Sequence, residues 1–176
     1  AKLFRSCSLA LYSILLCCIP DHFDADNSTT TWRKLHKYLD DLDPELEVTL
    51  FNDDLIGFFT SIPQDRILKA VDTVLDMYVA TLPADNTILN TDVTVDMMDK
   101  NPATRVFKGK QRRHQSSQRT ISLRHIGMIA KHSFDSGIFY VFGLCFAQKR
   151  GCCIGNQISP ILSSLTVAVE EHMWQK

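Results

Sequence analysis

The sequence predicts a mixed α/β (α+β) fold, because its length, its composition and its alternating helical and strand patterns all favour one. The chain has 176 residues, of which 45% are hydrophobic and 22% are charged. Such a chain can form one domain with its own core, or one lobe of a larger protein. The composition excludes a disordered acidic tail, a collagen-like repeat and a protein with several membrane spans.

The N-terminal apolar stretch, residues 9–19, predicts a buried helix that ends at Pro20. Its length of about 11 residues falls short of the roughly 20 that a helix needs to cross a bilayer, so no membrane span is predicted. Lys2 and Arg5 precede the stretch as in a signal peptide, but no cleavage site of small residues follows it. Anchoring to a membrane through residues 3–19 stays open as an alternative.

Further helices are predicted where apolar residues recur every three or four positions. Thr31 is a candidate cap for the first of them, while Pro63 and Pro160 suit the first turns of two others. The predicted helices cover residues 32–39, 64–81, 122–133 and 159–174.

Strands are predicted by runs of β-branched and aromatic residues. Residues 47–54 read as a strand that runs into two acids, residues 93–95 as a short strand, and residues 138–142 as a buried strand. We expect the strands at 48–54 and 139–146 to belong to a small sheet that helices cover.

The six cysteines indicate a reducing compartment rather than a disulfide framework. They include the adjacent pairs Cys17–Cys18 and Cys152–Cys153, and no CxxC spacing of a structural zinc site occurs. Because Cys152 and Cys153 follow Lys149 and Arg150, acidified thiols with a redox role remain a weaker alternative.

Positive charge is concentrated in the second half of the chain, although the formal net charge is only −1. Residues 101–134 contain eight Lys or Arg residues and no Asp or Glu. We call residues 105–131 the basic strip and expect it either to contact the phosphates of a nucleic acid or to be a solvated loop. The candidates for phosphate contacts are Arg105, Lys108, Arg112 and Arg113.

An acid at the end of a predicted strand is followed, five residues later, by an aromatic residue in the segment FNDDLIGFFTSIP, residues 51–63. This arrangement is typical of the palm of a polymerase, where the acid binds magnesium and the aromatic ring packs near the sugar of the incoming nucleotide. The spacing makes Asp54 the candidate metal ligand and Phe59 the candidate sugar gate, with Asp53 as a weaker candidate ligand.

A glycine-rich loop precedes the last predicted helix in the segment QKRGCCIGNQISPILSSL, residues 148–165. Glycine lets a backbone approach a ligand closely, and Ser159-Pro160 suits the start of a helix. Such a loop alone is weak evidence of a binding site, because ordinary capped helices also follow loops of this kind.

Together, these two segments resemble motifs A and B of reverse transcriptases. DLIGFFTSIP resembles motif A (residues 51–63), QKRGCCIGNQISPILSSL resembles motif B (residues 148–165), and FYVFGLCFAQ resembles the strand that leads into motif B. The two motifs occur in the expected order, and their residues are most similar to those of Penelope-like retroelement enzymes. The resemblance covers roughly residues 48–174.

The resemblance implies a right-hand polymerase, of which this chain would supply a partial fingers–palm lobe (residues 47–176) after an N-terminal helical segment (residues 1–46). It implies RNA-directed DNA synthesis by nucleotidyl transfer with two Mg²⁺ ions. The implied partners are an RNA/DNA template–primer and deoxynucleoside triphosphates (dNTPs), and the implied location is intracellular, in the nucleus or the cytoplasm.

Carried over position by position, the resemblance makes Asp54 the catalytic residue and metal ligand, while Leu55 offers its backbone carbonyl to the nucleotide. Phe59 becomes the sugar gate. Gly155, Ser159 and Pro160 are implied to shape the nucleotide and template pocket. Lys149 and Arg150, which lie within motif B, join the basic strip as predicted nucleic-acid contacts.

The sequence also departs from the family. Motif C (aromatic-x-Asp-Asp after motif B), the fingers arginine that clamps the triphosphate, and the thumb have no counterpart in these residues. Tyr38-Leu39-Asp40-Asp41 matches motif C but precedes motif A, so it would require a permuted palm; the end of a helix with solvated acids is the preferred interpretation.

We therefore expect a fragment that is incomplete for catalysis, and we leave open whether the chain is an enzyme. The alternative function is that of a non-catalytic structural or scaffolding subunit, derived from a polymerase palm, which binds protein partners in a larger assembly.

Overall fold

The computed structural model describes residues 2–20, 22, 28–49, 57–100, 105–108, 116–153 and 155–176. The chain divides into two compact units, which we call the large unit (Ala1–His22 with Gly57–Lys176) and the small unit (Phe23–Ile56). Helices and two small antiparallel sheets occur together, so the predicted α+β class is confirmed. Within the described ranges, no helix combines the length and the hydropathy needed to span a membrane.

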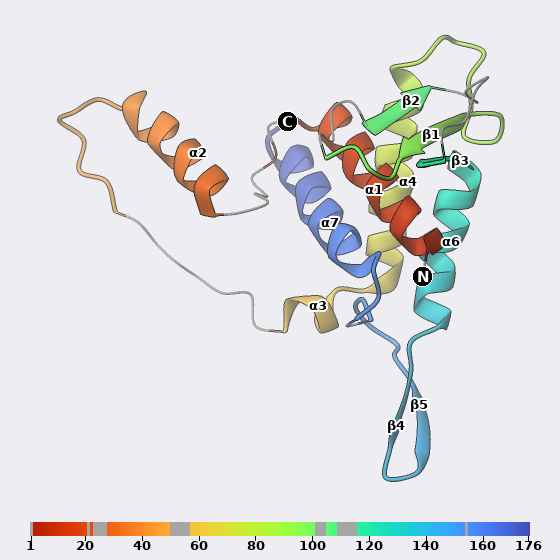
Figure 1. Ribbon diagram of the computed structural model, residues 1–176. Coiled ribbons are helices and arrows are strands. Elements are labelled where there is room, and N and C mark those ends of the chain that lie inside the picture. The colour runs from red at the N-terminus through yellow and green to blue at the C-terminus, as the bar shows by residue number, and fades with distance from the viewer. Residues whose placement is uncertain are drawn as a thin grey trace. The chain divides into compact units, whose positions relative to one another are not determined.

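The large unit is built around helices that pack against one another. They are α1 (Lys2–Cys18), α4 (Gln64–Ala80), α6 (Leu123–Asp135) and α7 (Ser159–Trp174). Helix α4 contacts the other three, and α1 also contacts α6 and α7 (Figure 1). The helices predicted at 64–81, 122–133 and 159–174 are confirmed to within two residues, because the apolar side chains that define them all face this common core.

Helix α1 confirms the predicted buried helix at residues 9–19, although it already begins at Lys2. Its buried face extends through Cys7, Leu11 and Ile14, which recur every three or four residues. The buried face of α1 therefore packs inside the large unit.

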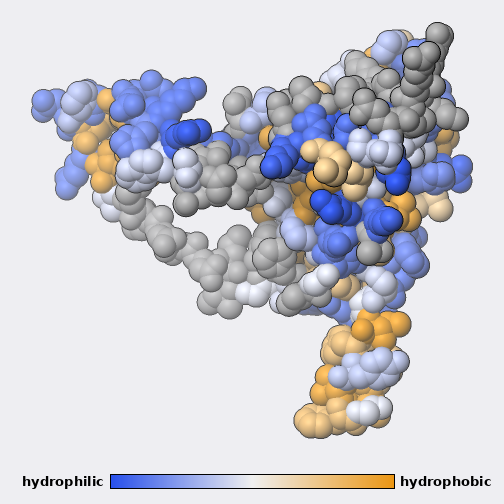
Figure 2. All heavy atoms as spheres, in the orientation of Figure 1, coloured by the Kyte–Doolittle hydropathy of each residue, from blue (hydrophilic) through white to orange (hydrophobic). Residues whose placement is uncertain are grey.

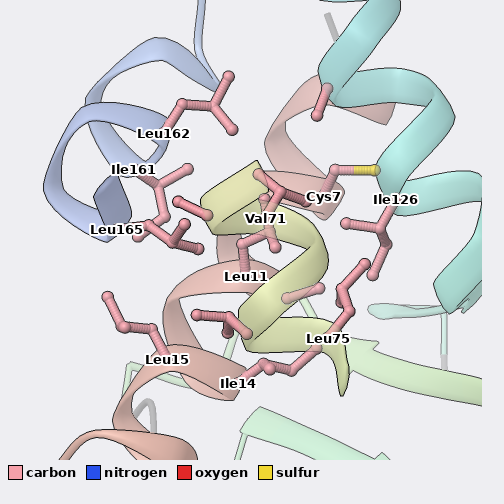
Figure 3. Packing of buried hydrophobic residues seen from close by; sticks show 14 of the residues in the cluster. Cys7, Leu11, Ile14, Leu15, Val71, Leu75, Ile126, Ile161, Leu162 and Leu165 are labelled. Atoms are coloured by element: carbon pink, nitrogen blue, oxygen red, sulfur yellow. The ribbon is translucent and has the colours of Figure 1, made fainter. Parts of the chain in front are cut away.

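The core lies where these helices meet. Figure 3 shows side chains of α1, α4, α6 and α7 pointing toward one another, with Leu11, Val71 and Leu162 among those that are fully buried. Helix α7 also has buried polar residues, and two of their hydroxyl groups make hydrogen bonds in the core. Thr166 Oγ1 donates to the Leu162 carbonyl at 2.7 Å, and Ser163 Oγ lies 3.5 Å from Cys152 Sγ.

One sheet consists of β1 (Asp92–Asp96), β2 (Val106–Lys108) and β3 (Gln118–Ser122), in the order β2-β1-β3 with antiparallel pairing. Val93, Val95 and Ile121 are buried, and the sheet contacts α1 and α6. Thr94 and Thr120 are paired across β1 and β3, and their hydroxyl oxygens lie 3.0 Å apart. The strand predicted at 93–95 is confirmed within β1.

The second sheet is a hairpin of β4 (Ile138–Val141) and β5 (Leu144–Ala147), which we call the apolar hairpin. The strand predicted at 138–142 is confirmed as β4, which ends at Val141, where the chain reverses through Phe142 and Gly143. The prediction that this strand is buried is wrong, because every residue of both strands is exposed. Both turn residues have positive φ (50° and 78°), as a two-residue type I′ turn requires. The expectation that helices cover the strand at 139–146 therefore also fails.

In the small unit, α2 (Ser28–Asp40) confirms the helix predicted at 32–39. Trp32 makes an edge-on contact with His36 on this helix, with ring centroids 4.5 Å apart. Tyr38, Leu39 and Asp40 are helical, whereas a motif C would place them on a β-hairpin; the permuted palm is therefore ruled out. Of the strand predicted at 47–54, residues 47–49 are not in a strand and the rest lies outside the described residues.

Candidate functional site

The motif A segment is described only from Gly57 onward, so Asp53, Asp54 and Leu55 lie outside the described residues. Gly57 has a φ of 65° and precedes a short helix, α3 (Phe58–Ser61). Thr60 Oγ1 donates to the Gly57 carbonyl at 2.9 Å, which closes this turn. Phe59 lies in α3, but its side chain is not among the described ones.

The motif B loop, residues 148–158, runs from the end of β5 to the start of α7. Gly151 and Gly155 have φ values of 70° and 89°, which side chains other than glycine rarely tolerate. Gln148 stabilises the first half of the loop, because its Nε2 donates to the carbonyls of Arg150 (2.7 Å) and Cys152 (3.1 Å).

Three hydrogen bonds join the end of the motif A segment, and the residue that follows it, to the motif B loop. Gly151 N–H donates to the Ile62 carbonyl at 2.7 Å. Gln64, in the first turn of α4, directs its Nε2 at the carbonyls of Gln148 (3.4 Å) and Gly151 (3.3 Å). Segments that are almost 90 residues apart in the sequence therefore lie side by side in the large unit.

The second half of the loop is held by the start of α7. Ser159 is buried, and its Oγ donates to the Cys153 carbonyl at 2.7 Å. Asn156 Oδ1 accepts from the Ile158 amide at 3.3 Å. Pro160 is exposed in the first turn of α7, where a residue without an N–H costs no helical hydrogen bond. Ser159 is thus a positioning residue, since its hydroxyl faces the loop backbone.

A hollow of about 620 Å³ opens beside this half of the loop. It is lined by loop residues, by the base of the apolar hairpin and by one residue of α1: Gln148, Cys153, Gly155, Asn156, Gln157, Ser136, Gly137, Ile138, Phe139 and Phe4. Of the three predicted pocket residues of motif B, only Gly155 lines the hollow.

The predicted nucleic-acid contacts fall into different environments. Lys149 and Arg150 are exposed on the motif B loop. Arg105 is only 9% exposed, and its guanidinium donates to the carbonyls of Asp99 (2.9 Å) and Lys100 (3.3 Å), so it stabilises the chain before β2. Lys108 lies in β2 with a side chain that is not described, and Arg112 and Arg113 lie outside the described residues.

The two cysteines of the loop are not acidified. Cys152 is buried, and burial is the main cause that raises the pKa of its thiol. Burial likewise raises the pKa of Cys153, in spite of Lys149 and Arg150 nearby in the sequence. A thiol with a raised pKa is a poor nucleophile at neutral pH. The redox alternative assumed thiols with a lowered pKa, so these pKa shifts do not support it. All six cysteines are free.

Magnesium binding stays a prediction. In the part of the chain that the structure describes, no group of three or more His, Cys, Asp or Glu side chains is arranged to hold a metal ion. The predicted ligand, Asp54, lies outside that part.

The base of the apolar hairpin is fitted closely to the motif B loop at Gly137. A methyl group at this position would collide with Cys153 Sγ and would lie 3.1 Å from the Phe134 carbonyl oxygen. We expect Gly137→Ala to lower the free energy of unfolding by about 1–3 kcal/mol, measured by urea denaturation. Gly127→Ala in α6 is the control, because the nearest atom would be 3.9 Å away and alanine favours a helix.

Cys153→Ala in the Gly137→Ala background should restore part of the loss, because it removes the colliding sulfur. The close fit would be refuted if Gly137→Ala were no more destabilising than Gly127→Ala.

Sequence reasoning missed the residues that hold this site together. Gln64, Gln148 and Gly151 make the contacts between the two motifs. Gln148 and Gly151 stood inside the motif B segment, but nothing in a sequence indicates which distant carbonyl a glutamine or a glycine amide will meet. Comparisons with models of protein families, with curated proteins and with solved structures gave no match for this chain.

Proposed function

We propose that this chain is a reverse transcriptase-like fingers–palm fragment, whose function is RNA-templated addition of deoxynucleotides to the 3′ end of a primer. The observation that supports this most is the 2.7 Å hydrogen bond from Gly151 N–H to the Ile62 carbonyl. A nucleotide site shared by motifs A and B requires these two segments to be neighbours, and their described parts are.

The motif B loop has properties that suit a nucleoside triphosphate. The backbone at Gly155 is open, with no atom within 4 Å of the place where a Cβ would be. Lys149 and Arg150 are exposed nearby in the loop, and cationic side chains form strong hydrogen bonds with phosphate oxygens. The hollow beside the loop falls within the range of about 300–1,000 Å³ that is typical of ligand pockets.

In this proposal, Asp54 is the catalytic residue and the magnesium ligand, Leu55 offers its carbonyl to the nucleotide, and Phe59 packs against the sugar. When bound, magnesium would supply charge stabilisation at the attacking and leaving oxygens of phosphoryl transfer. Ser159 and Pro160 act indirectly, by fixing the backbone of the motif B loop and the start of α7.

Removing the two exposed cations of the loop should weaken nucleic-acid binding. We expect Lys149→Ala/Arg150→Ala to reduce the slope of log affinity against log salt by about 1.5 for an RNA/DNA template–primer, because two phosphate contacts are lost. Fluorescence anisotropy of a labelled template–primer measures this slope.

The matched control is Arg33→Ala/Lys37→Ala, which removes the same charge from exposed positions on α2. An equal loss of affinity in both double variants would show that net charge alone is responsible, and it would count against a phosphate site on the motif B loop.

The alternative of a scaffolding subunit is favoured by a different observation, the apolar hairpin, whose exposed side chains offer a surface for a protein partner. The two functions are distinguished by nucleotide binding at the motif B loop, which a scaffold does not require.

A further inference from the structure

The apolar hairpin exposes more apolar surface than a protein that acts as a monomer usually does. Its exposed large side chains are Ile138, Phe139, Tyr140, Val141, Phe142, Leu144 and Phe146, and Figure 2 shows the hairpin as a projection that is mostly orange, with some paler spheres between. Taking ~200 Å² for a fully exposed aromatic side chain, we estimate roughly 700 Å² of exposed apolar area for the whole hairpin. Single patches of this size mark interaction sites.

Both faces of the hairpin are apolar. Residues paired across the strands share a face, so Phe139 and Phe146 lie on one face and Tyr140 and Cys145 on the other. The rings of Phe139 and Phe146 stack on each other, with centroids 5.7 Å apart. A hairpin that covered a core with one face would carry polar residues on the other, and this one does not.

The edges of the hairpin also lack the features that normally prevent strand pairing. No charged residue and no proline occur between Gly137 and Gln148, and within the described residues neither strand has a second neighbour. Soluble proteins usually protect such edges with lysine, proline or a bulge. A two-stranded hairpin by itself is only marginally stable in water, so additional strands would stabilise it.

We propose that the apolar hairpin is a homodimer interface, in which β4 pairs with β4 of a second copy of this chain about a two-fold axis to form a four-stranded antiparallel sheet. Every residue of β4 (Ile, Phe, Tyr, Val) favours strands, whereas β5 contains Cys and Ala. Pairing through β4 would give partners to the outward-facing backbone groups of this strand and would extend a marginally stable two-stranded hairpin to four strands. A nucleic acid is a poorer occupant, because the hairpin itself carries no positive charge.

Sedimentation equilibrium of the unmodified chain tests the proposal. We expect a dimer at concentrations on the order of 10 µM, and slower hydrogen exchange of the Tyr140 amide as the dimer forms; the Ile138 amide already donates to the Ser136 carbonyl at 2.9 Å. Tyr140→Lys should weaken dimerisation at least ~tenfold without changing the thermal unfolding midpoint of the monomer, because it places a charge on the pairing strand. A chain that stays monomeric throughout this range overturns the proposal.

Leu89→Lys is the matched control, because Leu89 is 73% exposed and Tyr140 is 74% exposed. If Leu89→Lys dissociates the dimer as strongly, the association is non-specific and the proposal fails.

A second variant, Phe142→Asn, keeps the test valid if Tyr140→Lys unfolds the hairpin. Asn-Gly is the preferred type I′ turn sequence, so this variant preserves the hairpin while removing its fully exposed tip ring, and it should also weaken the dimer. Loss of single-stranded DNA binding by these variants, with no dimer in the unmodified chain, would identify a stacking surface instead.

Discussion

Asp54→Ala should abolish the primer extension that we propose for this protein, with a loss of about 10³-fold or more. The proposed role of Asp54 is to hold magnesium where charge develops in the transition state, and loss of such a group costs several kcal/mol of transition-state stabilisation. The measurement is incorporation of a labelled dNTP on an RNA template with a DNA primer, in the presence of magnesium.

Asp53→Ala is the matched control, because it removes a carboxylate from the neighbouring position in the same segment. We expect a much smaller loss for this variant. Template–primer affinity should persist in both variants, because the phosphate contacts that we propose lie on the basic strip and on the motif B loop. Equal incorporation by the unmodified protein and by Asp54→Ala would contradict the assignment.

Leu11→Ala should lower the free energy of unfolding of the chain by about 3–5 kcal/mol. Leu11 is fully buried between α1 and its neighbouring helices, as Figure 3 shows, and truncating such a leucine loses its transfer free energy and leaves a cavity. Because small proteins are stable by only about 5–15 kcal/mol, much of the native state would be lost on mild heating. Urea denaturation followed by circular dichroism measures the effect.

Leu89→Ala provides the control, because it makes the same chemical change at an exposed position. It should alter the free energy of unfolding by less than about 0.5 kcal/mol. If the two variants were equally stable, α1 would not be a core helix of the large unit, and a role for this apolar segment outside the fold would have to be considered again.

The helices could be predicted from the sequence because local spacing determines them. Residues 64–80 place apolar side chains at every third or fourth position, and α4 follows with its ends at a proline and a short turn. In the sequence, Pro160 predicts the first turn of a helix, and in the structure it lies in the first turn of α7. In both helices, the face on which the sequence places the spaced apolar residues is the face that packs in the core.

The sheets could be predicted only in part, because their pairing is not local. Strand β1 has a recognisable Val-Thr-Val segment, but β2 is three residues long, and both β2 and β3 lie within the basic strip. For the apolar hairpin, composition correctly indicated strand, and burial was then inferred from hydrophobicity. The turn was missed because Phe142-Gly143 lacks the asparagine or aspartate that usually marks a type I′ turn.

The candidate site, too, could be predicted from the sequence only in part. The sequence identified both segments, and it placed the glycines of the motif B loop where the backbone has positive φ. It could not identify the hydrogen bond between Gly151 and Ile62, because that contact depends on how α4 and α7 pack against each other. Nor could it show that the Ser159 hydroxyl and the Arg105 guanidinium donate hydrogen bonds to backbone carbonyls.

The most direct test of the proposed nucleotide site is a titration of the isotopically labelled chain with a dNTP and magnesium, followed by amide resonances. If the motif B loop binds the triphosphate, the amides of Gly151, Gly155 and Asn156 should shift in a saturable manner, and Lys149→Ala/Arg150→Ala should weaken the binding. Saturable shifts located elsewhere in the chain, or no shifts in this loop at millimolar nucleotide, would contradict the account.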